Sequence, residues 1–185
     1  MRVISGSAKG RRLKSVPGDS TRPILDRVKE SLFNIVRDDI PDARWLDLFA
    51  GTGQIGIEAL SRGAAEVVFT DNVKKAIKTI YANLKHTQLT EGAEVRLTDA
   101  FAYLESIKSG YQQPFDLIYV APPQYIDLWV QVMNLLDSQP AAFLHKDGQI
   151  VVQIDPSEYQ PLELQHLSVV DQRKYGRTLL CFYQA

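Results

Sequence analysis

The chain has 185 residues, 45% of them hydrophobic and 23% charged, with a formal net charge of −1; this is the composition of one ordinary globular domain and excludes a disordered or fibrous protein. A single cysteine, Cys181, excludes an internal disulfide, and the three histidines lie too far apart in the sequence for a metal-binding motif, so we expect no metal. No apolar run approaches the ~18 residues of a membrane span, and there is no apolar secretory signal, so we expect a cytoplasmic protein without membrane contact.

The first 22 residues are strongly basic. They carry a net charge of +5, whereas the rest of the chain carries −6. The cationic residues are Arg2, Lys9, Arg11, Arg12, Lys14 and Arg22. MRVISG returning as RRLKSV, with Gly6 and Gly10 supplying turns, predicts a β-hairpin over residues 1–16. Such concentrated positive charge is expected where a protein contacts a phosphate backbone, although a solvated basic arm is the alternative interpretation.

The periodicity of the remaining chain predicts an α/β domain. Apolar residues at helical spacing predict a helix from Asp26 to about Arg37. Strand-like runs at 43–49, 66–71, 93–98, 115–120 and 148–154 then alternate with helices that begin near residues 54, 73, 100 and 126. This alternation predicts a parallel sheet with helices on both faces. Two further strand-like runs, 165–175 and 178–184, leave no room for a helix between them and predict a terminal antiparallel hairpin. We expect a single domain over 1–185, with a hairpin extension at 1–22 and a core at 40–185.

The segment DLFAGTGQIGIEALSRGA is the most informative motif. A strand ending near Leu48 turns through Gly51, Gly53 and Gly56 into a helix, whose first N–H groups are free to bind an anionic or polar ligand. Asp71 ends the next strand, where its carboxylate can accept both hydroxyls of a ribose. The string GTGQIG also matches the dinucleotide pattern GxGxxG, and a tight turn without a ligand is the structural alternative.

Asp47, just before this loop, favours one class of nucleoside ligand. Its carboxylate suits a ligand with an amino-acid cation, such as S-adenosylmethionine, and would repel the pyrophosphate of NAD. Asp99, at the end of the third predicted strand, can reach an adenine amino group or serve as an ordinary helix N-cap.

The fourth predicted strand runs directly into a double-proline motif. The motif residues are Ala121, Pro122, Pro123, Gln124 and Tyr125. Two prolines remove two backbone donors and fix a rigid extended turn at the carboxyl edge of the sheet, where ligands of open α/β folds bind. This rigidity is typical of a segment that positions a substrate, and a simple strand terminator is the alternative.

Together, these motifs resemble the RsmD family of 16S ribosomal RNA guanine-N2 methyltransferases over nearly the whole chain. MRVISGSAKGRRLKSV resembles the RNA-contacting hairpin of the family, STRP at 20–23 with DRVKESLFN at 26–34 matches its most specific block, and KYGRTLLCFY resembles its C-terminal hairpin. The resemblance implies a Rossmann-like class I fold with a seven-stranded mixed sheet and S-adenosyl-L-methionine as cofactor. It also implies 16S rRNA, within a small-subunit assembly particle, as partner. The cofactor-binding residues implied are Asp47, Phe49, Gly51, Gly53, Gly56, Asp71, Asp99 and Ala100.

The double-proline motif departs from the family pattern, Asp/Asn-Pro-Pro-Tyr/Phe. A guanine amine is a poor nucleophile because its lone pair is delocalised into the ring, so an acceptor side chain and the first proline carbonyl must orient it while an aromatic ring stacks on the base. Ala121 has no acceptor, and Tyr125 lies one residue later than the aromatic residue of the family. The Pro122 carbonyl remains, and we expect the amide oxygen of Gln124 to replace the missing acceptor.

The leading hypothesis is S-adenosylmethionine-dependent methylation of a guanine N2 amine in 16S rRNA. Three alternatives stay open. The first is an assembly factor that binds cofactor and RNA but is catalytically impaired, and the second is an amino-methyltransferase acting on DNA or protein. The third, a nicotinamide-dependent oxidoreductase, is disfavoured by Asp47, the double proline and the basic hairpin.

Overall fold

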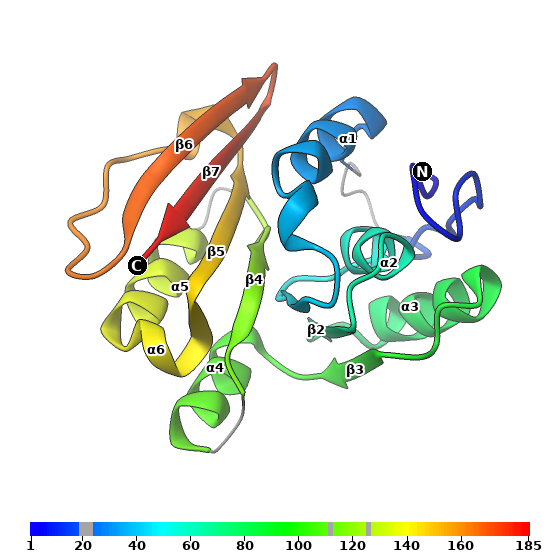
Figure 1. Cartoon of the computed structure of the whole chain (residues 1–185), viewed down its shortest axis with the longest axis horizontal. Helices are drawn as coiled ribbons and strands as arrows, with labels where there is room; N and C mark the ends of the chain where they lie inside the picture. The colour runs from blue at the N-terminus through cyan, green and yellow to red at the C-terminus, as the bar shows by residue number, and fades with distance from the viewer. Residues whose placement is uncertain (19–23, 111–112, 125–126) are drawn as a thin grey trace.

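The computed structural model describes residues 1–18, 24–110, 113–124 and 127–185. Arg22, the rest of the block at 20–23 and Tyr125 therefore lie outside the described residues. Within the described part, one sheet separates two layers of helices (Figure 1). Over the same residues, no helix combines the length and the apolarity that crossing a membrane requires.

The sheet has seven strands in the order β3-β2-β1-β4-β5-β7-β6. Their bounds are Arg44–Asp47 (β1), Glu66–Asp71 (β2), Ala93–Leu97 (β3), Phe115–Val120 (β4), Leu144–Ile154 (β5), Ser168–Tyr175 (β6) and Thr178–Gln184 (β7). The first five strands pair in parallel, and β7 pairs antiparallel with both β5 and β6. The predicted seven-stranded mixed sheet with a C-terminal antiparallel hairpin is confirmed.

Helices cover both faces because the central strands are apolar on both sides. One face packs against α1 (Asp26–Ile35), α2 (Gln54–Ser61) and α3 (Lys74–Thr87). The other packs against α4 (Ala100–Ser109), α5 (Leu128–Ser138) and α6 (Pro140–Phe143). Successive residues of a strand, such as Trp45 and Leu46 of β1, enter opposite clusters, as the pleat requires.

The end of the first helix and the start of β5 differ from the sequence prediction. The first helix ends at Ile35 and is followed by a 3-10 turn at Arg37–Asp39, so its end falls two residues before the predicted Arg37. Strand β5 begins at Leu144 and not at Gly148, because Leu144 pairs with Phe115 before an irregularity in the ladder. Residues 145–147, between Leu144 and Gly148, are polar and exposed, so the apolar pattern of the sequence did not indicate that β5 begins at Leu144.

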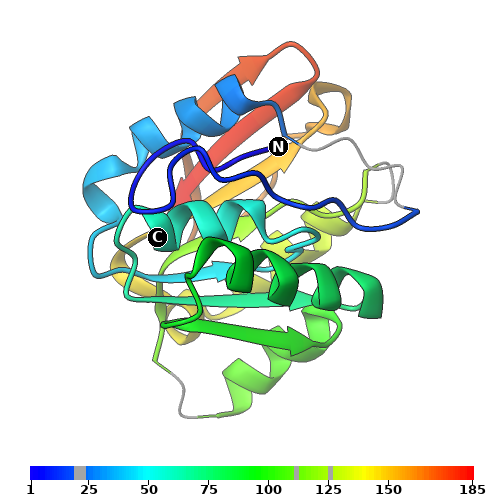
Figure 2. The same ribbon diagram turned by 90° about the vertical axis from the view of Figure 1, so that its right-hand side faces the viewer.

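The N-terminal segment folds back on itself and packs against the domain (Figure 2). Arg2 and Arg12 form a single antiparallel bridge, flanked by hydrogen bonds from Val3 N–H to the Arg11 carbonyl and from Gly10 N–H to the Val3 carbonyl, both 2.9 Å. The predicted hairpin is therefore present as a turn with one bridge and without regular strands. We call residues 1–16 the N-terminal hairpin.

A buried carboxylate fixes this hairpin to the helical layer. Glu58, fully buried on α2, accepts hydrogen bonds from the backbone N–H groups of Ile4 (2.8 Å) and Ser5 (2.9 Å). It also pairs with Lys29 of α1 at 3.1 Å and with Arg62 at 2.8 Å. Burial is the largest influence on Lys29 and lowers its pKa, while Glu58 opposes that shift. One side chain thus joins the hairpin, α1 and α2.

Candidate functional site

The carboxyl ends of β1, β2 and β4 meet at one edge of the sheet, because these strands are parallel and adjacent. Asp47 is in register with Phe69 of β2 and with Tyr119 of β4. The segments that follow the three strands are the glycine loop, the turn after Asp71 and the double-proline motif. The topology therefore brings together the three motifs that the sequence singled out.

The glycine loop presents an open face at Gly51. Gly51 and Gly53 have φ angles of +54° and +76°, a conformation that suits glycine, and Gly53 immediately precedes α2. A Cβ built on Gly51 would meet no atom of the described residues within 4 Å, so these residues leave space there for a ligand. A Cβ on Gly56 would lie 2.2 Å from the Phe69 ring. Gly56, which we expected in the cofactor site, allows close packing of α2 on β2.

Asp71 shapes the loop from the neighbouring strand. Its Oδ2 accepts the Gly51 N–H at 2.9 Å, and its Oδ1 accepts the Val73 N–H at 2.8 Å. Each carboxylate oxygen has a second lone pair, and the side chain is only half-buried, so the group can still accept hydroxyls from a ribose. The sequence did not indicate that the same carboxylate also holds the loop.

Asp47 lies beneath the loop and is almost fully buried. Its Oδ2 accepts the Gly56 N–H at 3.1 Å, inside the first turn of α2. Burial, with a smaller contribution from the charge of Asp71, raises the pKa of Asp47 to about 7. In this structure Asp47 supports the start of α2, and its contact with a ligand cation stays a prediction.

The raised pKa of Asp47 predicts a pH-dependent stability. Its carboxyl takes up a proton more readily in the folded state than in the unfolded state, so its contribution is fully present below about pH 4 and is lost as pH rises towards 7. We expect Asp47→Asn to raise the free energy of unfolding by about 1–3 kcal/mol at pH 8 and to leave it nearly unchanged at about pH 4. Urea denaturation at both pH values measures this difference. Equal effects at the two pH values would contradict it.

Three other residues expected in the cofactor site, Asp99, Ala100 and Phe49, have structural contacts of their own. Asp99 caps α4, with Oδ1 accepting the N–H groups of Phe101 at 2.9 Å and Ala102 at 3.2 Å. Ala100 is buried and Phe49 is partly buried in the core cluster on the α4 face. The N-cap interpretation of Asp99 is therefore correct, and any cofactor contact by these three residues stays a prediction.

The double-proline motif continues β4 at the same edge. Ala121 packs partly against the core, Pro122 is buried, and Pro123 and Gln124 are exposed. The exposed Gln124 amide has no hydrogen-bond partner among the described residues, and its contact with a substrate stays a prediction. Tyr125 lies outside the described residues.

Sequence reasoning missed Gln153, on the neighbouring strand. The buried Tyr119 hydroxyl donates to the Gln153 side chain, which is half-buried. Tyr119 pairs with Val151, so Ala121 and Gln153, each two residues further on, share the same face of the sheet. The amide atom that does not contact Tyr119 is not fully buried. A glutamine inside the apolar run IVVQI is the signal that could have drawn attention to it.

Asn83 of α3 connects the N-terminal hairpin to the glycine loop. This fully buried amide accepts the Lys14 N–H at 2.8 Å and donates to the Lys14 carbonyl at 3.1 Å and to the Thr52 carbonyl at 2.9 Å. Thr52 also donates to the sulfur of Met1 at 3.3 Å. The hairpin backbone is therefore fixed beside the glycine loop, unlike a free solvated arm.

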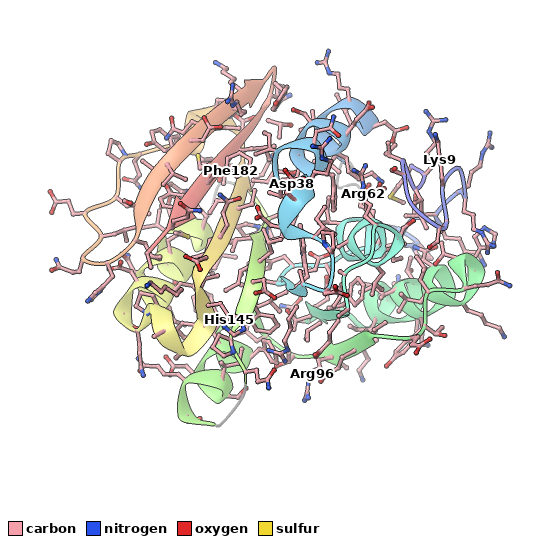
Figure 3. All side chains as sticks on the ribbon, viewed as in Figure 1. Lys9, Asp38, Arg62, Arg96, His145 and Phe182 are labelled. Atoms are coloured by element: carbon pink, nitrogen blue, oxygen red, sulfur yellow. The ribbon has the colours of Figure 1, made fainter. Side chains whose placement is uncertain are left out.

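The cationic side chains of the hairpin divide into two groups. Arg2 pairs with Asp26 at 2.9 Å, and Arg11 donates to the His86 carbonyl at 2.7 Å and to Gln88 at 2.9 Å. The others are exposed, and none has a carboxylate partner among the described residues; they are Lys9, Arg12 and Lys14. Figure 3 shows Lys9 on the hairpin next to α3. These three side chains are available to an anionic partner.

Known proteins match this chain over nearly its whole length. A family model described as conserved hypothetical protein 95 matches residues 1–184. The putative rRNA methyltransferase YlbH of Bacillus subtilis is 41% identical over 184 residues, covering 100% of this chain and 98% of that protein. The ribosomal RNA small subunit methyltransferase D of Escherichia coli K12 is 30% identical, covering 100% and 89%. The solved structure of the putative methyltransferase yhhF from Escherichia coli matches with a TM-score of 0.84 at 31% identity, covering 100% and 97%.

Proposed function

The chain belongs to the RsmD family of ribosomal RNA methyltransferases, and from this membership we propose that it methylates the exocyclic N2 amine of a guanine in 16S rRNA, with S-adenosylmethionine as methyl donor. One observation carries the proposal. Asn83 hydrogen-bonds both the basic hairpin and the glycine loop, so the segment proposed to bind RNA and the segment proposed to bind the cofactor lie side by side. A nicotinamide enzyme has no need of such a hairpin.

The donor set at the carboxyl edge fits this cofactor. The open backbone at Gly51 allows close approach, and Asp71 retains lone pairs for the two ribose hydroxyls. When bound, S-adenosylmethionine supplies a methyl group on a sulfonium, and the sulfur keeps the bonding electron pair as the methyl leaves. Bringing this methyl close to the base is the task of the loop and of Asp71.

The double-proline motif positions the guanine amine. The Pro122 carbonyl accepts one N2 hydrogen, and the Gln124 amide oxygen accepts the other, so the nitrogen lone pair turns out of the ring plane towards the methyl. As N2 gains the methyl it loses one proton to solvent, which leaves a neutral secondary amine. Tyr125 supplies the aromatic face for the base.

A second candidate function rests on Ala121. Because this position lacks an acceptor, the chain could bind cofactor and RNA as an assembly factor without transferring a methyl group. Incubation with labelled S-adenosylmethionine and unmodified small-subunit particles separates the two. We expect label at a single guanine N2, mapped by nuclease digestion and mass spectrometry. Particle binding without any label would establish the second candidate.

Cofactor selectivity gives a direct test of Asp71. We expect calorimetry to detect S-adenosylhomocysteine and not NAD, and Asp71→Ala to weaken S-adenosylhomocysteine binding by about 1.5–3 kcal/mol through lost charge-assisted hydrogen bonds. Asp116→Ala serves as the matched control and should change affinity much less, because Asp116 is likewise a half-buried carboxylate that accepts a backbone N–H, that of Arg44, but lies at the opposite edge of the sheet. Tight NAD binding with no response to S-adenosylhomocysteine would overturn the methyltransferase proposal.

A further inference from the structure

Helix α3 has a lysine-rich outer face. Four of its lysines are exposed, and none has an ion-pair partner within the described part of the chain; they are Lys74, Lys75, Lys78 and Lys85. Lys74, Lys78 and Lys85 are spaced i, i+4 and i+11, so they form one stripe along the helix. The opposite face, which includes Ile80 and Leu84, is buried against the sheet. The helix therefore presents unpaired positive charge to solvent.

This face is continuous with the N-terminal hairpin. The hairpin follows the side of α3 through Lys14 at Asn83 and through Arg11 at the His86 carbonyl. A Cβ built on Gly18 would lie 4.0 Å from the Lys75 ammonium nitrogen, so this lysine stands where the chain leaves the hairpin. Figures 1 and 2 show the hairpin alongside α2 and α3. The hairpin and the lysines of α3 thus form a single basic surface.

Helix α3 brings this basic surface close to the glycine loop. The helix begins three residues after Asp71, at the edge where the glycine loop lies. From Lys74 to Lys85 the stripe extends about 16 Å along the helix axis. The body of the protein outside the first 22 residues has a net charge of −6, so a cluster of unpaired lysines here is a local departure from its average charge.

We propose that four lysines of α3 bind the RNA phosphate backbone and extend the hairpin surface towards the glycine loop: Lys74, Lys75, Lys78 and Lys85. This inference rests on the proposed function. Lysine is a point charge, so these contacts position the RNA without reading its sequence. An anionic membrane fits less well, because a membrane-binding helix buries an apolar face in lipid and the apolar face of α3 is already packed on the sheet.

The test is the salt dependence of RNA binding. We expect Lys75, Lys78 and Lys85, replaced together by Gln, to lower the slope of log affinity against log salt by roughly 0.7–0.9 per lost contact, and to weaken binding of unrelated RNA sequences equally. Lys74 is kept because it adjoins the loop at Asp71. The matched control replaces three other exposed lysines by Gln: Lys108, Lys146 and Lys174. It makes the same change in net charge and should retain the wild-type slope.

Two further measurements distinguish a failure of this inference from a failure of the proposed function. Neutralising Lys9, Arg12 and Lys14 of the hairpin should also reduce the slope. If the hairpin variant does so and the α3 variant matches the control, this inference is wrong and the proposed function stands. If the wild type does not bind RNA at all, the proposed function itself fails. If the α3 variant instead loses binding only to phosphatidylserine vesicles, the surface is a membrane site and the inference is overturned.

Discussion

Glu58→Ala is expected to lower the free energy of unfolding by about 3–5 kcal/mol, a large part of the stability of a domain this size. The substitution leaves the Lys29 ammonium buried without its counter-ion. It also leaves the N–H groups of Ile4 and Ser5 without their acceptor, each with its own desolvation cost. Chemical denaturation measures the loss. Hydrogen exchange gives a second readout, because the amides of Ile4 and Ser5 should lose protection first.

The matched control is an ion pair at the surface. Arg37 and Asp38 pair at 3.2 Å but are 74% and 87% exposed, so Asp38→Ala should change stability by less than about 0.5 kcal/mol. Glu58→Gln keeps the shape of the side chain and loses its charge, which makes it the variant to use if Glu58→Ala does not fold. A loss below about 1 kcal/mol for both Glu58 variants would show that the buried network is not what holds the hairpin.

The sheet could be predicted from the sequence because its strands are recognisable from their local residue pattern. Strands β2, β4 and β7 are buried apolar runs bounded by polar residues, and their bounds match the predicted runs. The order of the first five strands then brings the glycine loop and the double-proline motif to one edge without any knowledge of side chains. The site was therefore predictable at the level of which segments meet.

The polar framework was not predictable in the same way. Lys29, Glu58 and Asn83 lie on amphipathic helices where polar residues normally face water, and their partners are up to 69 residues away in the sequence. Only tertiary packing shows that these three side chains are fully buried. Likewise, Gly51 and Gly56 belong to one motif, but a Cβ on Gly51 would meet no described atom within 4 Å, whereas a Cβ on Gly56 would meet the Phe69 ring. The motif specifies the residue types, but only the fold determines which way each residue faces.

The rate of methyl transfer depends on which group at the altered motif accepts the hydrogens of the guanine amine. If Gln124 holds the guanine amine, Gln124→Ala should reduce kcat by about 10²–10³, equivalent to ~3–4 kcal/mol, while binding of S-adenosylhomocysteine stays intact. Ala121→Asn should raise kcat, because it restores the acceptor that the family pattern carries at this position. Single-turnover transfer to small-subunit particles measures both changes.

Gln153 is the matched comparison, since it is a side-chain amide close to this edge and lies on the face of the sheet that Ala121 shares. In either orientation of its amide an oxygen lone pair remains, so it is chemically able to take the same role. Gln153→Leu should therefore leave kcat nearly unchanged if Gln124 is the acceptor. The reverse result, a loss at Gln153 that Ala121→Asn repairs and no loss at Gln124, would transfer the role to β5. Full turnover in all three variants would mean that neither amide is required on its own, which leaves the Pro122 carbonyl as the acceptor that orients the amine.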